Sequence, residues 1–250
     1  MMDFDVFPLN EGYYTIGFDK IFHPFNMEVD KLEARSKGSL LVEIQPFLVR
    51  TANGRNILFD TGLGFTNDVG MLVIAENLNR YGVGMDDISA VVLSHLHKDH
   101  AGGLTFINRY GEQEETFKYA DYYIGEEEFS FALEKGEPSY TIADFQFLKG
   151  REDVHWMGKK GTILDFVHYE QDGGHCPFHT SFLLEGSRKF FFGGDVVPQL
   201  KQLTHRYMAK YDFDGRKSMD LREKYAKKGM EEDWEFMFYH DVKTPLAKLN

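Results

Sequence analysis

Four side chains that can bind metal lie within six residues of one another in the run SHLHKDHAGG at 94–103: His95, His97, Asp99 and His100. The apolar run AVVL at 90–93 precedes them, which places them where a buried strand would end and a loop would begin. The first two histidines are two positions apart, so an extended backbone points both rings to the same side. A lone histidine is usually a solvated loop residue, but this cluster favours two neighbouring metal ions.

A site for two ions needs more ligands than this one run supplies. Three candidates terminate or neighbour other apolar runs: His175 in DGGHCPFHT, Asp195 at the end of KFFFGGD, and His240 at the end of EFMFYHD. A carboxylate such as Asp195 can bridge two cations, because each of its oxygens has lone pairs to donate. Five neutral imidazoles and two carboxylates suit two divalent metal ions, with zinc first and manganese or iron as alternatives.

The chemistry expected of such a site is hydrolysis. Two metal ions roughly 3.5–4 Å apart can bridge a hydroxide, lower its pKa and polarise a carbonyl or phosphoryl oxygen. No nucleophilic serine or cysteine is then needed, and the sequence has no Gly-x-Ser-x-Gly motif. Asp99 would bind the second ion and also carry a proton to the leaving group, which makes it the catalytic candidate. The bond cleaved would be that of an ester, lactone, thioester or phosphoester.

The composition of the 250-residue chain is that of a globular protein, with 42% hydrophobic residues. A net charge of −12 disfavours a nucleic-acid partner. No run approaches the roughly 18 apolar residues of a membrane span, and the first residues lack the features of a secretory signal. The single cysteine, Cys176, rules out an internal disulfide. We therefore expect a cytoplasmic protein with a small-molecule substrate and no nucleic-acid or membrane partner, either a monomer or a homodimer.

The remaining pattern predicts sheets covered by helices. Asn53-Gly54 lies between the strand-like runs 39–51 and 55–62, which predicts a β-hairpin. We expect the run after the histidine cluster, AGGLTFINRYG, to turn into a helix. Other helices are expected at 71–82, 126–136 and 219–234, and other strands at 121–125, 162–170, 180–186, 189–195 and 235–241. No linker divides the chain, so a single domain over 1–250 is expected, with a sheet sandwich and outer helices rather than one parallel sheet.

The run HLHKDH resembles the HxHxDH signature of the metallo-β-lactamase-fold hydrolases. The other pieces follow in that family's order over roughly 40–245: DTG at 60–62, GH at 174–175, the aspartate closing FFGGD, and a late histidine. The resemblance implies a four-layer αβ/βα sandwich, two β-sheets flanked by helices, with the metals at an open edge. It assigns the first metal to His95, His97 and His175, and the second metal to Asp99, His100 and His240. It also implies that Asp195 bridges the two metals and that Asp60 orients ligand histidines without binding metal.

Two nearby residues are not expected to be ligands. His179 resembles the family's extra histidine in this turn, and we interpret it as structural or hydrogen-bonding. Cys176 directly follows His175, but family members with a cysteine ligand have it where this chain has Asp195. We therefore expect Cys176 to be a small, half-buried residue.

The C-terminal run EEDWEFMFYHD is similar to the lactonase-like branch of the family, which includes N-acyl homoserine lactone hydrolases. The aromatic segment at 11–25 resembles the leading segment of the same branch. These likenesses imply a lactone or another acyl ester as the substrate. The aromatic side chains would either wall an acyl-chain pocket or pack the edge of the sandwich.

Three other functions stay open: a thioesterase of the type II glyoxalase kind, a phosphodiesterase on the same site, and a metal-binding protein without catalysis. The first is disfavoured because the chain ends ten residues after His240, without a glutathione-binding extension. The acidic composition disfavours a tRNA-processing nuclease. A non-catalytic protein would usually lack a ligand, and this chain lacks none.

Overall fold

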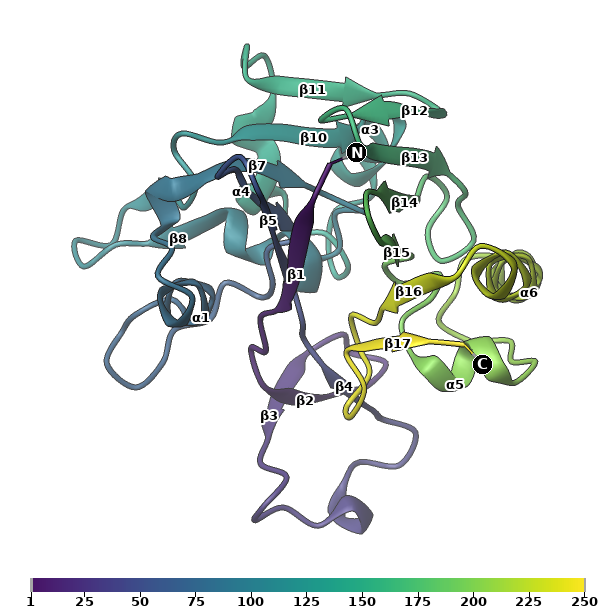
Figure 1. The fold of residues 1–250 in the computed structure, drawn as a ribbon. Coiled ribbons are helices and arrows are strands. Elements are labelled where there is room, and N and C mark those ends of the chain that lie inside the picture. The colour runs from purple at the N-terminus through teal and green to yellow at the C-terminus, as the bar shows by residue number, and fades with distance from the viewer. Residues whose placement is uncertain (1, 250) are drawn as a thin grey trace.

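Two six-stranded sheets lie face to face and carry helices on their outer sides in the computed structural model, which describes residues 2–249 (Figure 1). Three hydrophobic clusters fill the layers, one between the sheets and one under each set of helices. The expected sandwich of two sheets with outer helices is therefore confirmed.

The first sheet has the order β1-β5-β6-β7-β10-β11. Its first three strands are antiparallel and its last four are parallel. The bounds of its strands are Phe4–Pro8 (β1), Phe47–Thr51 (β5), Asn56–Phe59 (β6), Ile88–Val92 (β7), Asp121–Gly125 (β10) and Val154–Met157 (β11). The helices that pack on its outer face are Val73–Arg80 (α1), Glu126–Lys135 (α3) and Ile142–Phe145 (α4).

The second sheet has the order β12-β13-β14-β15-β16-β17 and is antiparallel except between β15 and β16. Its strands are Lys160–Ile163 (β12), Val167–Gln171 (β13), Thr180–Glu185 (β14), Lys189–Phe192 (β15), Trp234–Met237 (β16) and Leu246–Lys248 (β17). Between β15 and β16 the chain forms Leu200–Thr204 (α5) and Gly215–Glu231 (α6), which cover the outer face.

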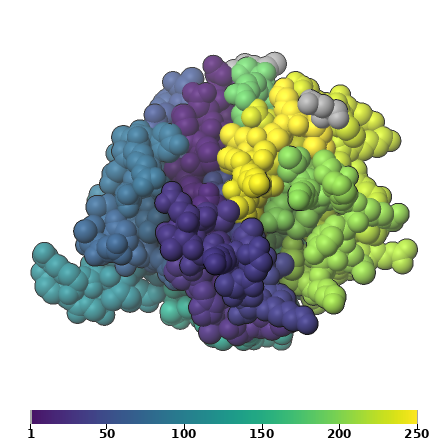
Figure 2. Space-filling view, turned by 90° about the horizontal axis from the view of Figure 1, so that it is seen from below, coloured from purple at the N-terminus to yellow at the C-terminus, as the bar shows by residue number. Residues whose placement is uncertain are grey.

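A smaller three-stranded sheet, β3-β2-β4, is formed near the N-terminus by Tyr13–Ile16 (β2), Phe22–Phe25 (β3) and Leu40–Glu43 (β4). Figure 2 shows the face that lies at the bottom of Figure 1. The N-terminal residues, in purple, lie in its centre, between the teal part of the chain and the green and yellow part. The remaining short elements are Thr105–Ile107 (β8), Gln113–Glu115 (β9), Lys98–Ala101 (α2) and the 3-10 turns Leu32–Ala34, Met85–Asp87, Gly102–Leu104 and Gln146–Leu148.

Strand side chains alternate between the layers, because successive residues of a strand point to opposite faces. In β15, Phe190 and Phe192 enter the cluster between the sheets, whereas Phe191 packs on the helix side, 4.4 Å from the ring of Tyr225. Both faces are buried, so the run reads as continuously apolar. This packing fixes the direction in which each strand delivers the loop that follows it.

Three of the expected elements are wrong. The run after the histidine cluster forms a 3-10 turn and strand β8 instead of a helix, because Gly102-Gly103 is a poor helix former and Thr105–Ile107 pairs with β9. The expected strand 162–170 is a hairpin, β12 and β13, since Leu164 and Asp165 take left-handed φ values of 54° and 71°. No glycine marks that turn, so the sequence gives no warning of it.

The expected strand-like run 39–51 divides into β4 and β5, which belong to different sheets, because Pro46 between them has no N–H for a strand ladder. The other elements lie close to their expected positions, with α6 beginning at Gly215 and ending at Glu231. The expected hairpin at Asn53-Gly54 joins β5 to β6. Among residues 2–249, no helix combines the length and apolar composition needed to cross a membrane.

Candidate metal centre

The seven side chains expected to bind metal converge at one edge of the two sheets. His95 and His97 lie in the loop after β7, and the short helix α2 carries Asp99 and His100. The second sheet supplies the other three, from the β13–β14 loop and from the segments after β15 and β16: His175, Asp195 and His240. Each comes from a segment that follows a strand of one of the two sheets, so the strand packing positions it.

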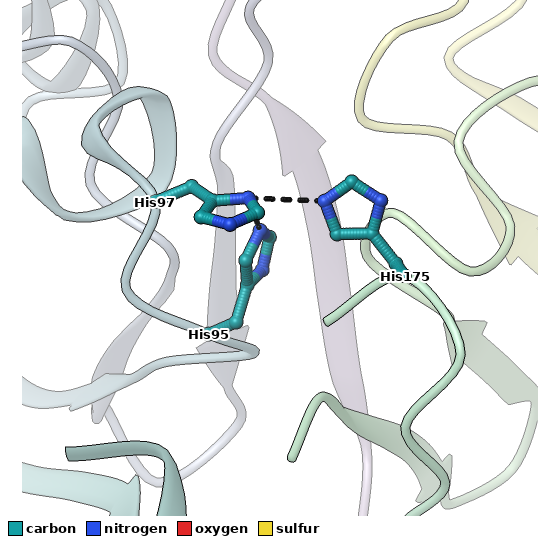
Figure 3. Close-up of side chains that lie close together, drawn as sticks. All are labelled: His95, His97 and His175. Atoms are coloured by element: carbon teal, nitrogen blue, oxygen red, sulfur yellow. Dashed lines mark hydrogen bonds between the residues drawn. The ribbon is translucent and has the colours of Figure 1, made fainter. Parts of the chain in front are cut away.

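Three histidines form the first group of the centre (Figure 3). His97 Nδ1 is 3.0 Å from His95 Nε2 and 3.0 Å from His175 Nε2. The ligand nitrogens of the three rings all lie within 4.8 Å of one another, which suits donors around a common cation. Asp195 Oδ2 adds an oxygen 3.2 Å from His175 Nε2.

The second group lies on the other side of Asp195. Asp195 Oδ1 is 3.0 Å from His240 Nε2 and 3.3 Å from His100 Nε2. Asp99 Oδ2 is 3.4 Å from His240 Nε2 and 3.7 Å from His100 Nε2. The two oxygens of Asp195 therefore face different groups of histidines.

Hydrogen bonds behind three of the rings fix which nitrogen faces the centre. His100 Nδ1 bonds Asp60 Oδ2 at 2.8 Å, and His175 Nδ1 bonds Asp212 Oδ1 at 3.1 Å. His240 Nδ1 donates to a backbone carbonyl, that of Glu43, at 2.7 Å. Because each Nδ1 carries the proton, each Nε2 keeps a lone pair for a cation.

Asp60 connects two histidines of the centre. It follows β6 with a φ of 55°, is fully buried, and accepts hydrogen bonds from the Ser94 N–H at 2.8 Å and hydroxyl at 2.7 Å. The Ser94 hydroxyl oxygen is 3.0 Å from His95 Nδ1, and Asp60 bonds His100 directly. The residue therefore lies where it orients histidines and does not face the centre itself.

The protonation states differ between the two groups of the centre. Burial and the neighbouring imidazoles lower the pKa values of His95 and His97 well below the usual range, so both rings are neutral. Burial alone would lower the pKa of His100, but Asp195 and Asp99 raise it well above its usual value. Burial opposes ionisation of Asp195, yet the adjacent histidines, His240 foremost, hold its pKa well below its usual value.

The donor set fits a divalent metal. Within residues 2–249, the buried atoms His100 Nε2 and Asp195 Oδ1 have no hydrogen-bond partner, although buried polar atoms are nearly always paired. Both point into the cluster of imidazoles and carboxylates, the ligand types that zinc and related cations use. A cation would satisfy these atoms and would reverse the preference of His100 for a proton.

The two residues not expected to bind metal lie behind the centre. His179 Nδ1 bonds Asp172 Oδ1 at 3.0 Å, and its Nε2 accepts the backbone N–H of Asp195 at 3.2 Å. Cys176 is 2% exposed rather than half-buried, because α3 covers it and its Sγ donates to Glu128 Oε2 at 3.3 Å. Burial raises the pKa of this thiol well above its ordinary value, so it stays protonated.

Several supporting residues are missing from the sequence-based expectations, and five of them leave no signal in the sequence: Ser94, Glu128, Asp172, Asp212 and Tyr239. Tyr239 stacks on the His100 ring at 4.1 Å and donates its hydroxyl to the Asp99 carbonyl at 2.6 Å. Arg222 does leave a signal, because it shares the buried face of α6 with Tyr225 and Ala226. An arginine on the apolar face of a helix indicates a buried partner.

Matches to known proteins place the chain by family and by fold. The family model of the metallo-beta-lactamase superfamily matches residues 43–228. No curated protein sequence matches. A probable metal-dependent hydrolase from Staphylococcus aureus has a similar structure, with a TM-score of 0.80 and 21% identity over 98% of this chain and 92% of that one.

Two lactonases have similar structures. AidC, a dizinc quorum-quenching lactonase in complex with a product, has a TM-score of 0.73 and 19% identity over 98% of this chain and 90% of that one. A quorum-quenching N-acyl homoserine lactone lactonase has a TM-score of 0.68 and 20% identity over 95% and 92%. At this identity the likeness shows a shared fold. The family model matches more than half of the chain, so the chain belongs to the metallo-β-lactamase superfamily and is a metal-dependent hydrolase.

Proposed function

We propose that the chain is a dinuclear-metal hydrolase that opens a lactone or another neutral acyl ester. The observation that carries the dinuclear part is the position of Asp195. Its Oδ2 faces His175 of the first group, and its Oδ1 faces His240 of the second group. A carboxylate with one oxygen toward each group suits a bridge between two cations.

The proposal divides the ligands between two ions. The first ion takes His95, His97 and His175, the second takes Asp99, His100 and His240, and Asp195 is shared. We propose zinc for both, because imidazole and carboxylate are its common ligands and the rings of His95 and His97 are neutral. When bound, such a pair supplies an activated water and a Lewis acid.

Asp99 is the residue that we propose to carry the proton to the leaving group. Its carboxylate lies beside the second group, and its side chain is 11% exposed, which suits contact with a bound substrate. The alkoxide released from a lactone has a pKa far above neutral, and a proton delivered in the transition state therefore lowers the barrier.

The acyl-ester class rests on two supports. Several similar structures are described as lactonases, including complexes with N-acyl homoserine products. The N-terminal aromatic segment lies beside the histidine motif, since the Phe22 ring is 6.0 Å from Lys98 Nζ. Tyr14 and Phe22 are themselves buried and pack against each other, whereas Phe18 is 91% exposed. Tyr14 and Phe22 therefore pack the edge of the sandwich. We propose that other aromatic residues of the segment 11–25 contact the acyl chain of the substrate.

Metal content tests the dinuclear part. Protein purified without chelators, or reconstituted with zinc, should contain close to two divalent ions per chain by elemental analysis. A content of one ion or less after reconstitution contradicts the bridging role of Asp195.

A substrate panel tests the reaction. We expect acyl lactones to be opened faster as the acyl chain lengthens, and faster than a thioester or a bis-aryl phosphodiester. Faster cleavage of the phosphodiester by orders of magnitude would contradict the acyl-ester assignment. Rates that do not respond to chain length would contradict an apolar acyl site.

The Asp99→Asn variant tests the proton carrier. The amide keeps an oxygen toward the second group but cannot deliver a proton, so we expect partial metal retention and a loss of turnover of about 100-fold or more. Asp68→Asn makes the same change at an exposed position and should leave turnover unchanged. Full activity in Asp99→Asn with bound metal would exclude this role.

A further inference from the structure

We propose that helix α6, which contributes no metal ligand, is the support that fixes His175 and Asp195, with Arg222 and Tyr225 as positioning residues. The inference rests on the proposed metal centre. It assigns the affinity of that centre in part to a helix on the outer face of the second sheet. Two separate chains of hydrogen bonds lead from this helix to the centre.

The first chain begins at Arg222, which is 2% exposed. Its Nη2 pairs with Asp212 Oδ2 at 3.0 Å, and Asp212 Oδ1 holds His175 Nδ1 at 3.1 Å. The same guanidinium donates from Nε to the Val196 carbonyl at 2.6 Å and from Nη1 to the Tyr207 carbonyl at 3.1 Å. Val196 directly follows Asp195, so one arginine restrains the neighbourhood of two ligands.

The second chain begins one turn further along, at Tyr225. Its hydroxyl donates to Asp172 Oδ2 at 2.8 Å, and Asp172 Oδ1 bonds His179 Nδ1 at 3.0 Å. His179 Nε2 accepts the backbone N–H of Asp195 at 3.2 Å. Because Nε2 must be unprotonated to accept this bond, the proton of His179 is on Nδ1, and the Nδ1–H donates a hydrogen bond to Asp172.

The start of α6 also lies directly against the loop that carries His175. The N–H groups of Phe213 and Asp214 donate to the carbonyls of His175 and Gly174, at 2.9 and 2.8 Å. Gly174 has a φ of 95°, and a Cβ added there would be 2.7 Å from Ser218 Oγ on α6. The helix and the loop therefore have little room to shift independently.

The hydrogen bonds of Arg222 require both its charge and its planar guanidinium. Its side chain is a buried cation whose partner, Asp212, is also fully buried, so the pair is stable only while both members are present. A lysine at this position keeps the charge but has no planar fork to make three bonds in fixed directions. A phenylalanine in place of Tyr225 keeps the packing and removes one hydrogen bond to Asp172.

Metal affinity measured by competition with a chromophoric zinc chelator tests the inference. Loss of a residue that orients metal ligands typically weakens binding about 10–100-fold. We expect a loss in this range for Arg222→Lys, and a loss toward its lower end for Tyr225→Phe, because Asp172 retains its bond from His179. The matched controls are Arg216→Lys on the exposed first turn of α6 and Tyr119→Phe on the surface, and both should bind zinc as the wild type does.

A second control separates positioning from general destabilisation. Ile74→Val removes a methylene from the cluster under α1, on the far sheet, and should lower the melting temperature without changing zinc affinity. Long-range ¹H–¹⁵N spectra of the imidazoles should show His179 protonated on Nδ1 in the wild type, and Tyr225→Phe should shift that signal.

Each outcome bears on one of the two proposals. Wild-type protein that binds no zinc contradicts the metal centre. Wild-type protein that binds two ions, together with unchanged affinity in both Arg222→Lys and Tyr225→Phe, overturns the role of α6 and leaves the centre intact. An equal loss of affinity in Ile74→Val would also overturn it, since simple destabilisation would then account for the effect.

Discussion

Glu11 is a buried carboxylate outside the metal centre. It packs under the turn that follows β6, where its Oε2 accepts the Leu63 N–H at 2.9 Å and its Oε1 has no partner within the described residues 2–249. A Cβ on Gly62 would be 2.1 Å from this carboxylate, which is why that position is glycine. Burial raises the pKa of Glu11 from 4.5 to about 8, so the native protein holds it protonated at neutral pH.

Because the pKa of Glu11 is raised in the folded protein, we predict that the free energy of unfolding falls as the pH rises. A group whose pKa is higher in the folded state contributes stability that is complete below pH 4.5 and is lost as the pH rises through about 8. The slope from this one group approaches about 1.4 kcal/mol per pH unit. Glu11→Gln keeps an oxygen for Leu63 and cannot ionise, so its free energy of unfolding in urea should fall less steeply over this range.

The exposed substitution Glu33→Gln is the control for Glu11→Gln, and it should follow the wild-type curve. Parallel curves for the wild type and Glu11→Gln would show that the buried carboxyl does not titrate in this range.

At the scale of elements, the turn after β6 and the helix α2 are joined by backbone contacts. The Thr61 N–H and hydroxyl both donate to the His100 carbonyl, at 2.7 and 3.0 Å, and the Gly103 N–H donates to the Gly62 carbonyl at 3.1 Å. A Cβ on Gly103 would be 2.0 Å from the Thr61 carbonyl oxygen. This close approach places His100 within hydrogen-bonding distance of Asp60.

Gly103→Ala should therefore reduce both stability and metal content. The new methyl group would push α2 away from the turn and pull His100 from Asp60. Gly54→Ala is the matched control, since Gly54 has a φ of +86° and open space around it, and strain alone costs about 1–2 kcal/mol there. We expect a larger loss of unfolding free energy in Gly103→Ala and loss of metal in that variant only. Equal losses with full metal content would contradict this account.

At the scale of the whole molecule, the metal centre joins the two sheets. Four proposed ligands follow β7 of the first sheet, and three come from loops of the second. Hydrogen bonds also cross between the halves at this edge, for example from the Thr180 N–H to the Ser94 carbonyl at 2.9 Å and from the Tyr239 hydroxyl to the Asp99 carbonyl at 2.6 Å. A cation that binds the native state and not the unfolded chain stabilises the fold in proportion to its affinity.

Removal of metal with a chelator should lower the melting temperature, and addition of zinc should restore it. A free metal concentration 100 times the dissociation constant corresponds to about 2.7 kcal/mol of stabilisation per ion. Calorimetry with and without chelator measures this difference. In Asp195→Ala, which removes the shared carboxylate, the chelator should change the melting temperature much less. If the chelator does not change the melting temperature of the wild-type protein, the metal does not stabilise the fold.

The sequence by itself determined the class of chemistry and the framework of the fold. The spacing of His95, His97, Asp99 and His100 after an apolar run is local information, and strand alternation and the Asn53-Gly54 turn are local as well. The confirmed sandwich and the metal-dependent hydrolase class both follow from such patterns. The individual ligands stay predictions, which the geometry supports.

The tertiary structure decided how the centre is held. Asp212 is 37 residues from His175 and ten from Arg222, and nothing in the sequence links the three. Only the packing of α6 on the second sheet brings them together, because hydrogen bonds depend on distance in space and not along the chain. The burial of Cys176 against α3 likewise depends on tertiary packing. The β12–β13 turn is a further case, because its two left-handed residues are not glycines and the sequence therefore gives no sign of the turn.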